Sequence, residues 1–415
     1  APIRRRVAPV SCPALSAARL AIPGVMDAEG RVDESRLRMH ICKNRGLVWR
    51  FLFGMYPCSS TALERSLLQE QLFVRYRVMK KKWQTFLPSA KKISLNGTDE
   101  LIKAVRYFEE REAEAQQENQ FQSEEVQVRL AFLELQAQFL FGGVSFHREE
   151  LQEAIRIIDK DVPRTNRDLS YYNEGLGNLL VLRDILITYA AFHPVSYAQG
   201  MNDLCSRFLE VLDCEIDTFW SFSCYMEKFS KDFQADGLHR KIELEAALLK
   251  ELDPPLYAHL AKDNMESLTF CHWLLLGFQR EFEHSEALRL FEILSCDHLE
   301  LISQQVDQAR HHERLAQENI ASPESELHTI NTDFTFELFL CAAILLDNRD
   351  SLLQCRDDVQ LIQFTSLHRK LDLNSMLQKA ERHFYNYCKS CSWDYMNGRC
   401  RVNTNTQEDF IDHLR

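Results

Sequence analysis

The feature that most limits the fold of this chain is a helical spacing of apolar residues that recurs in a sequence with few helix breakers. Residues 178–194, NLLVLRDILITYAAFHP, place apolar side chains on one face of a helix. Glycine occurs 13 times and proline 11 times in 415 residues. The same helical spacing is found in segments 124–141, 216–229, 241–252, 268–282 and 372–387. No series of glycine-bounded strands alternates with these segments, so the sequence predicts an all-α protein.

The length of the chain predicts more than one compact core, because single cores stop growing at about 250–300 residues. The expected organisation is a linker, a first lobe, a second lobe and a tail, at residues 1–20, 21–235, 236–390 and 391–415. The linker is expected to be disordered or a remnant of an upstream region, although its arginine, serine and alanine content resembles a transit peptide. Two polar stretches are expected to be insertions or solvated segments, at 108–127 and 303–333.

Composition argues against several classes of protein. The formal net charge of −12 argues against a general nucleic-acid binder, because neutralising phosphates requires clustered lysine and arginine. Many of the 13 cysteines lie in apolar runs, as Cys271 and Cys341 do, which predicts reduced thiols and a cytoplasmic protein. The longest apolar run is the nine residues 338–346, whereas a membrane span needs about 20. We therefore predict no transmembrane helix.

A polar side chain follows directly after a helix stop in IIDKDVPRTNRD, residues 157–168. Pro163 prevents a regular helix through this turn, which carries Asp161 and Arg164. We expect Arg164 to project outward, with its rotamer held by the carboxylate of Asp161. A guanidinium is planar, permanently charged and suited to phosphate oxygens, so it could stabilise charge on a transferred phosphoryl group. The alternative is an ordinary structural ion pair.

A second polar side chain follows a helix stop in VSYAQGMNDL, residues 195–204, because the preceding helix is expected to end at His193–Pro194. Gln199 lies in this stretch beside Gly200. A glutamine amide both donates and accepts hydrogen bonds, so it could orient a water molecule that attacks a phosphate. The alternative is a capped turn without a catalytic role. Taken singly, each of the two stretches is open to both interpretations.

Together, the two stretches resemble the TBC family of Rab GTPase-activating proteins. The family motif I-x-x-D-x-x-R matches Ile158, Asp161 and Arg164, followed by Thr165. The family motif Y-x-Q-G-M-x-D matches Tyr197, Gln199, Gly200, Met201 and Asp203. The helix between the motifs matches the family pattern L-x-x-I-L-x-x-Y, and the resemblance covers roughly residues 21–390.

The resemblance implies an all-helical, two-lobed, V-shaped domain whose partner is a Rab-family small GTPase in its GTP-bound state. It implies that Arg164 is an arginine finger at the phosphates and that Gln199 substitutes for the glutamine of the Rab. It also implies a set of supporting residues: Asp161, Thr165, Tyr197, Gly200 and Asp203. Asp161 would orient the arginine. GTP and Mg²⁺ belong to the partner, so we expect no cofactor and no metal in this chain.

The resemblance also implies a role in vesicle traffic, with recruitment of a cytoplasmic protein to endosomal or autophagic membranes through its partner. No nucleic acid is expected. The sequence departs from the family in a first-lobe connection, LRMHICKNRGLVW, that is several residues short, and at Asn166 and Phe291. The short connection and the polar insertions leave an alternative function open. In it, the protein is a non-catalytic helical adaptor that binds a GTPase or another trafficking protein. The two functions differ in whether activity depends on Arg164 and Gln199.

Two further motifs have other chemistry. Candidate zinc ligands occur in the segment YCKSCSWDYMNGRC and just before it. They are His383, Cys388, Cys391 and Cys400. A complete second pair at metal spacing is missing, so we expect an ordinary cysteine-bearing tail. KKKW at 80–83 is a short basic cluster that predicts a solvated helix face or, as an alternative, a membrane-surface patch.

Overall fold

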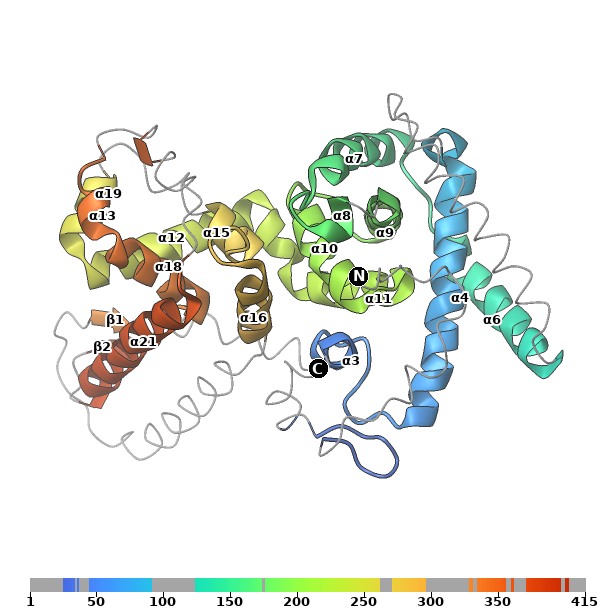
Figure 1. The fold of residues 1–415 in the computed structure, drawn as a ribbon, viewed down its shortest axis with the longest axis horizontal. Helices are drawn as coiled ribbons and strands as arrows, with labels where there is room; N and C mark the ends of the chain where they lie inside the picture. The colour runs from blue at the N-terminus through green and yellow to red at the C-terminus, as the bar shows by residue number, and fades with distance from the viewer. Residues whose placement is uncertain are drawn as a thin grey trace. The chain divides into compact units, whose positions relative to one another are not determined.

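The structure, a computed structural model, shows helices through almost all of the residues that it describes (Figure 1). These residues are 25–33, 36, 45–91, 124–173, 176–261, 271–295, 328–330, 334–355, 360–361, 371–396 and 400–402. The all-α expectation is therefore confirmed, with one addition. Two short parallel strands, β1 (His328–Ile330) and β2 (Cys400–Val402), pair with each other. Strands of three residues are too short to show the alternation from which a strand is predicted.

Contacts divide the chain into two compact units, Ala1–Lys231 and Asp232–Arg415. The lobes expected from the sequence divide at residue 235, and the V shape of the pair stays a prediction. The expected linker at 1–20 and most of the expected insertion at 303–333 lie outside the described residues, as does most of the tail. Each unit is described by itself below.

In the first unit, α9 (Leu176–Phe192) packs against several other long helices, and it confirms the helix expected within 178–194. These helices are α4 (Ala62–Phe86), α7 (Arg148–Asp161), α10 (Met201–Leu212) and α11 (Glu215–Phe229). The remaining elements in this part of the chain are α3 (Arg45–Leu52), η2 (Pro88–Lys91), α6 (Glu124–Gly142), η4 (Val162–Arg164), α8 (Ser170–Asn173) and η5 (Ser230–Phe233). The expected helices at 124–141 and 216–229 are thus confirmed as α6 and α11.

Part of the KKKW cluster, residues 80–83 near the end of α4, faces the protein interior. Lys80 Nζ lies 2.7 Å from both Asp184 Oδ2 and Glu215 Oε1. Trp83 is fully buried, and its Nε1 donates a hydrogen bond to Thr188 Oγ1 at 2.9 Å. The expectation of a solvated face is therefore wrong for Lys80 and Trp83, because the fold brings carboxylates of α9 and α11 beside this lysine.

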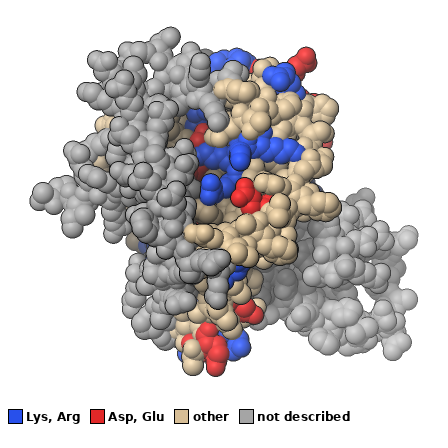
Figure 2. Space-filling model, turned by 90° about the vertical axis from the view of Figure 1, so that its right-hand side faces the viewer, with Lys and Arg blue, Asp and Glu red and all other residues tan. Residues whose placement is uncertain are grey.

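Basic side chains gather on one face of the molecule. Figure 2 views the right-hand side of Figure 1, where α4 and α6 lie, and shows a band of Lys and Arg on a largely uncharged surface. Arg77 and Lys81 of α4 are exposed. Arg129 of α6 instead binds the buried carboxylate of Glu70, with Nε 2.7 Å from Oε2. Part of the basic charge in this region therefore neutralises buried acids.

A buried ion pair ties α3 to α11. Arg50 donates hydrogen bonds from Nε and Nη2 to Asp217 Oδ2, at 2.8 and 2.6 Å. Gln69 of α4 donates to the other oxygen of Asp217 at 2.7 Å, and Tyr56 donates to the Gln69 side chain. The network joins three helices whose residues are up to 167 positions apart in the sequence.

The second unit is built around α18 (Phe336–Asp347), most of whose side chains are buried. It packs against α12 (Ala235–Leu252), α15 (Cys271–Leu276) and α21 (Leu373–Met396). The remaining helices that the structure describes in this unit are α13 (Pro254–Leu260), α16 (His284–Ser295) and α19 (Arg349–Leu352). No helix in the described part of the chain combines the length and the apolar content that crossing a bilayer requires.

Several helix boundaries differ from those expected. The helix expected at 268–282 ends at Leu276, because Gly277 and Phe278 take positive φ values of 58° and 57° and turn the chain. The first helix of the second unit, α12, begins earlier than expected, and α21 ends later. Helix ends are set by one or two backbone angles, which apolar spacing does not report.

Candidate functional site

The helix α7 ends where the first polar stretch begins. Asp161 is its last residue, and the short turn η4, which contains Pro163, carries the chain to Arg164. The Arg164 side chain is 62% exposed, whereas the Asp161 side chain is 2% exposed. Arg164 Nη2 lies 2.5 Å from Asp161 Oδ1, so a buried carboxylate holds one edge of an otherwise exposed guanidinium. The structure thus brings together the two residues that the sequence paired.

The second polar stretch forms a turn between α9 and α10. Gln199 is exposed, and its amide has no hydrogen-bond partner among the described residues. The next residue, Gly200, is buried and has a φ of 101°, a left-handed conformation that glycine adopts without steric cost. A side chain at position 200 would therefore strain the turn that presents Gln199.

Tyr197 connects the two stretches. Its side chain is buried, and its hydroxyl donates a hydrogen bond to Asp161 Oδ2 at 2.7 Å. Burial, and next the hydrogen bond to Asp161, raise the pKa of Tyr197 above its ordinary value of 10.0, so the hydroxyl keeps its proton. Asp161 therefore receives Arg164 on one oxygen and Tyr197 on the other.

Asn202 also connects the two stretches, and it is not among the residues expected from the sequence. Its Nδ2 donates to Thr165 Oγ1 at 2.9 Å, and its Oδ1 accepts from the backbone N–H of Gly200 at 3.1 Å. The sequence signal is an asparagine in the first turn of a helix, where such side chains often bond nearby backbone groups. That signal predicts the bond to Gly200 but not the bond to Thr165.

Two more of the expected residues lie behind these contacts. Thr165 is buried, and its hydroxyl donates to the backbone carbonyl of Asp161 at 2.9 Å. Asp203 is also buried, in the first turn of α10, with Oδ1 3.4 Å from Asn202 Nδ2. All seven expected site residues therefore lie in one hydrogen-bonded region or on the turns that it supports. Their catalytic roles stay predictions.

Asn166 stands where the family resemblance leads us to expect an aspartate. It adopts a φ of 43°, in the left-handed region that asparagine tolerates better than most residues. Its Nδ2 donates to Ser206 Oγ of α10 at 2.7 Å. The departure at this position therefore adds a further bond between the Arg164 segment and α10.

The site presents an exposed guanidinium and an exposed carboxamide from a buried polar framework. The N–H groups of Arg164 that do not face Asp161 are free to bind an anion from outside, and guanidinium geometry suits phosphate. The amide of Gln199 is free both to donate and to accept. The chemistry of these two groups suits the binding of an anion and the positioning of a polar group from outside the protein.

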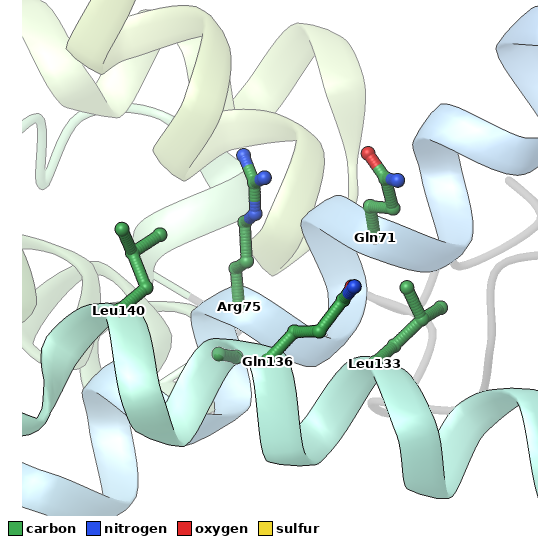
Figure 3. Close-up of a pocket in the computed structure, with 6 residues that line it drawn as sticks. Gln71, Arg75, Leu133, Gln136 and Leu140 are labelled. Carbon is green, nitrogen blue, oxygen red and sulfur yellow. The ribbon is translucent and has the colours of Figure 1, made fainter.

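A separate pocket lies between α4 and α6 (Figure 3). It is lined by Gln71, Arg75, Leu133, Gln136, Ala137 and Leu140. In Figure 3, Leu133, Gln136 and Leu140 rise from α6 towards α4. None of the lining residues belongs to the Arg164 or Gln199 stretch, so this pocket is not part of the candidate site.

The zinc candidate is only partly covered by the structure. His383 and Cys388 lie on α21, whereas the side chains of Cys391 and Cys400 lie outside the described residues. Within the described residues, no group of three or more His, Cys, Asp or Glu side chains is placed to hold a metal ion. The expected absence of a metal stays a prediction.

Comparison with known proteins identifies a family. The sequence profile of the Rab-GTPase-TBC domain matches residues 43–306, more than half of the chain. The chain is 40% identical over 146 residues to TBC1 domain family member 17 of Homo sapiens, covering 33% of this chain and 22% of that protein. It is 27% identical over 369 residues to the GTPase-activating protein GYP7 of Yarrowia lipolytica, covering 82% of this chain and 38% of that protein. The chain thus spans well under half the length of these curated relatives.

Among solved structures, the chain is similar to the Ypt/Rab-GAP domain of Gyp1p. The TM-score is 0.51 at 17% sequence identity, and the match covers 88% of this chain and 96% of that one. At this identity the similarity concerns the fold, and it agrees with the helical architecture described above. The profile match spans both the Arg164 and the Gln199 stretch.

Proposed function

Because the chain belongs to the Rab-GTPase-TBC domain family, we propose that it accelerates GTP hydrolysis by a Rab-type small GTPase. The relative from Yarrowia lipolytica is named a GTPase-activating protein, and the solved Gyp1p chain is described as a Ypt/Rab-GAP domain, which supports this proposal. The observation that carries it is the exposed Arg164 on a buried carboxylate, joined through Tyr197 to the turn of Gln199. By returning the Rab to its GDP-bound form, the protein would regulate vesicle traffic.

In this proposal Arg164 is an arginine finger. Its guanidinium enters the nucleotide site of the GTP-bound partner and stabilises the charge that develops on the γ-phosphoryl group. Asp161 holds one edge of the guanidinium, so less side-chain freedom is lost when the finger docks. An arginine supplied in trans to a GTPase contributes about 10³–10⁵ to the rate.

Gln199 is the second finger in this proposal. Its amide orients the attacking water and so substitutes for the glutamine of the Rab. The left-handed backbone at Gly200 allows the turn to extend towards the partner. GTP and Mg²⁺ are held by the partner, and neither finger forms a covalent bond, so this chain contributes positioning and electrostatics alone.

The test is GTP hydrolysis by a panel of purified Rab proteins, with the wild-type chain and with Arg164→Ala and Gln199→Ala. We expect at least one Rab to respond to the wild type, and Arg164→Ala to remove about 10³–10⁵ of the acceleration. Gln199→Ala should remove about 10²–10³, because one transition-state hydrogen-bonding group is lost. Acceleration that survives Arg164→Ala would refute the finger mechanism.

The matched control is Arg156→Ala. Arg156 lies on α7, is 56% exposed and pairs with Glu153 three residues away, as Arg164 pairs with Asp161. We expect this variant to retain the full acceleration, because Arg156 lies outside both motifs. If no Rab is accelerated but one of them binds the wild-type chain, the non-catalytic adaptor function replaces the proposed one.

A further inference from the structure

We propose that Asn202 is the positioning residue that sets the two fingers relative to each other. The inference rests on the proposed function, since it assigns a role in the same reaction. Asn202 is buried, so it does not touch the partner itself. Its hydrogen bonds instead reach the neighbour of each finger: Gly200 beside Gln199, and Thr165 beside Arg164.

The direction of these bonds follows from the groups that Asn202 faces. The backbone N–H of Gly200 can only donate, so the amide atom that faces it must be the oxygen. This leaves Nδ2 to face Thr165 Oγ1 at 2.9 Å. The Thr165 hydroxyl already donates its proton to the Asp161 carbonyl, so it accepts from Asn202. The two hydrogen bonds are therefore donated in the same direction: Asn202 donates to Thr165, and Thr165 donates to the Asp161 carbonyl at the end of α7.

The bond to Gly200 acts on the glutamine side. Gly200 precedes α10, and the first N–H groups of a helix have no partner within it. Asn202 Oδ1 satisfies one such donor in the turn that also carries Gln199, and the Tyr197 hydroxyl lies 3.1 Å from the same oxygen. Loss of this oxygen would leave a buried donor unpaired and free the turn to move.

Other side chains of similar size cannot make both of these hydrogen bonds. Leucine has nearly the same shape but neither donates nor accepts. Aspartate keeps the acceptor for Gly200 but cannot donate to Thr165, and it adds a charge beside Asp203 and near Asp161. Only a carboxamide of this length offers both bonds, so in this proposal a buried residue affects the rate through the two segments that it joins.

The test is steady-state GTP hydrolysis by a Rab that responds to the wild type, with Asn202→Ala. Displacing a catalytic group by about 1 Å costs about 10² in rate, so we expect kcat to fall about 100-fold. The KM for the Rab should change less than about threefold, because the docking surface is untouched. Asn178→Ala is the control, because Asn178 is also buried in the first unit and bonds the Tyr171 carbonyl instead. This control should keep kcat within about twofold of the wild type.

Thr165→Val tests the same link from the other side and replaces Asn202→Ala if that variant does not fold. The losses in kcat that the two substitutions cause should not multiply, because both break the same link. The double variant should lose about as much kcat as Asn202→Ala alone. Amide hydrogen exchange gives a readout without any Rab, and Asn202→Ala should expose the Gly200 N–H to exchange. An unchanged kcat in folded Asn202→Ala, or a loss matched by Asn178→Ala, would overturn the inference alone. A wild-type chain that accelerates no Rab would overturn the proposed function, and the inference with it.

Discussion

Two arginine–aspartate pairs in the first unit use the same chemistry to different effect. Arg50 donates from Nε and Nη2 to Asp217 and from Nη1 to the Gly46 carbonyl, and its side chain is 10% exposed. Arg164 donates from Nη2 to Asp161, and its side chain is 62% exposed. The two aspartates are alike, with side chains 1% and 2% exposed.

The difference between the pairs lies in how much of the guanidinium is used inside the protein. A guanidinium has five N–H donors on three nitrogens, and each of the three nitrogens of Arg50 donates to a group inside the protein. Asp161 takes one edge of Arg164 and leaves the rest to solvent. A buried aspartate beside an arginine therefore does not by itself indicate a structural ion pair. The exposure of the arginine decides how much of its guanidinium remains available to a group outside the fold.

The largest effect on stability is expected from the removal of Arg50, and the removal of Arg164 is its comparison. Arg50→Ala leaves Asp217 buried without its cation, so the free energy of unfolding should fall by about 3–5 kcal/mol. Arg164→Ala removes a mostly exposed partner and leaves Asp161 its bond from Tyr197, so the fall should stay below about 1 kcal/mol. Urea unfolding of both variants measures the difference. Equal losses would break the comparison.

A smaller effect is expected from the hydroxyl that supports the exposed pair. Tyr197→Phe leaves Asp161 Oδ2 without its donor, which should cost about 1–3 kcal/mol of stability and lower kcat, because Arg164 is held less well. Tyr76→Phe is the matched variant, since the buried Tyr76 hydroxyl donates to the Glu215 carboxylate at 2.5 Å. It should destabilise the fold to a similar extent and leave kcat unchanged. If both variants lower kcat equally, the Tyr197 bond has no special role.

A buried carboxyl without a cation sharpens the comparison. Glu245 of α12 is buried, and among the described residues no N–H or O–H group donates to its carboxyl oxygens, which have only the weak Cys341 thiol beside them. Burial raises the pKa of Glu245 well above its ordinary value of 4.5, the Cys341 thiol opposes this in part, and the charge of Glu337 adds to it. A carboxyl with a raised pKa stabilises the folded state below the unfolded pKa, and this contribution is lost as the pH rises towards the folded pKa.

The variant Glu245→Gln stays neutral at every pH and so removes this dependence. Relative to the wild type, the free energy of unfolding of this variant should increase as the pH rises from about 5 to about 8, because only the wild type loses stability over this range. Thermal or urea unfolding at the two pH values measures the change. A difference between variant and wild type that is the same at both pH values would show that Glu245 does not titrate in this range.

The smallest effect on stability is expected at the exposed pair of Arg156 and Glu153. Both side chains are more than half exposed, so solvent screens their attraction. Arg156→Ala should leave the melting temperature unchanged within the error of the measurement. A marked loss of stability would mean that exposure is a poor guide to the role of an arginine pair in this protein.

Local sequence determined much of this protein. Apolar spacing predicted helices that the structure contains, because a helix face is set by residues three and four apart. Pro163 predicted the break before Arg164, since proline cannot continue a regular helix. The spacing within the first motif predicted Asp161 beside Arg164, because three positions on a helical turn bring side chains together. The finger roles themselves stay predictions.

Tertiary structure decided what lies beside these elements. Asn202 bonds Thr165 across 37 residues of sequence, and Arg50 bonds Asp217 across 167, so no local pattern shows either pair. Lys80 lies in a basic run that suggests a solvated face, yet two carboxylates from other helices surround it. Spacing within a helix determines which side faces the core, whereas the partner of a buried polar group depends on which helices the fold packs together.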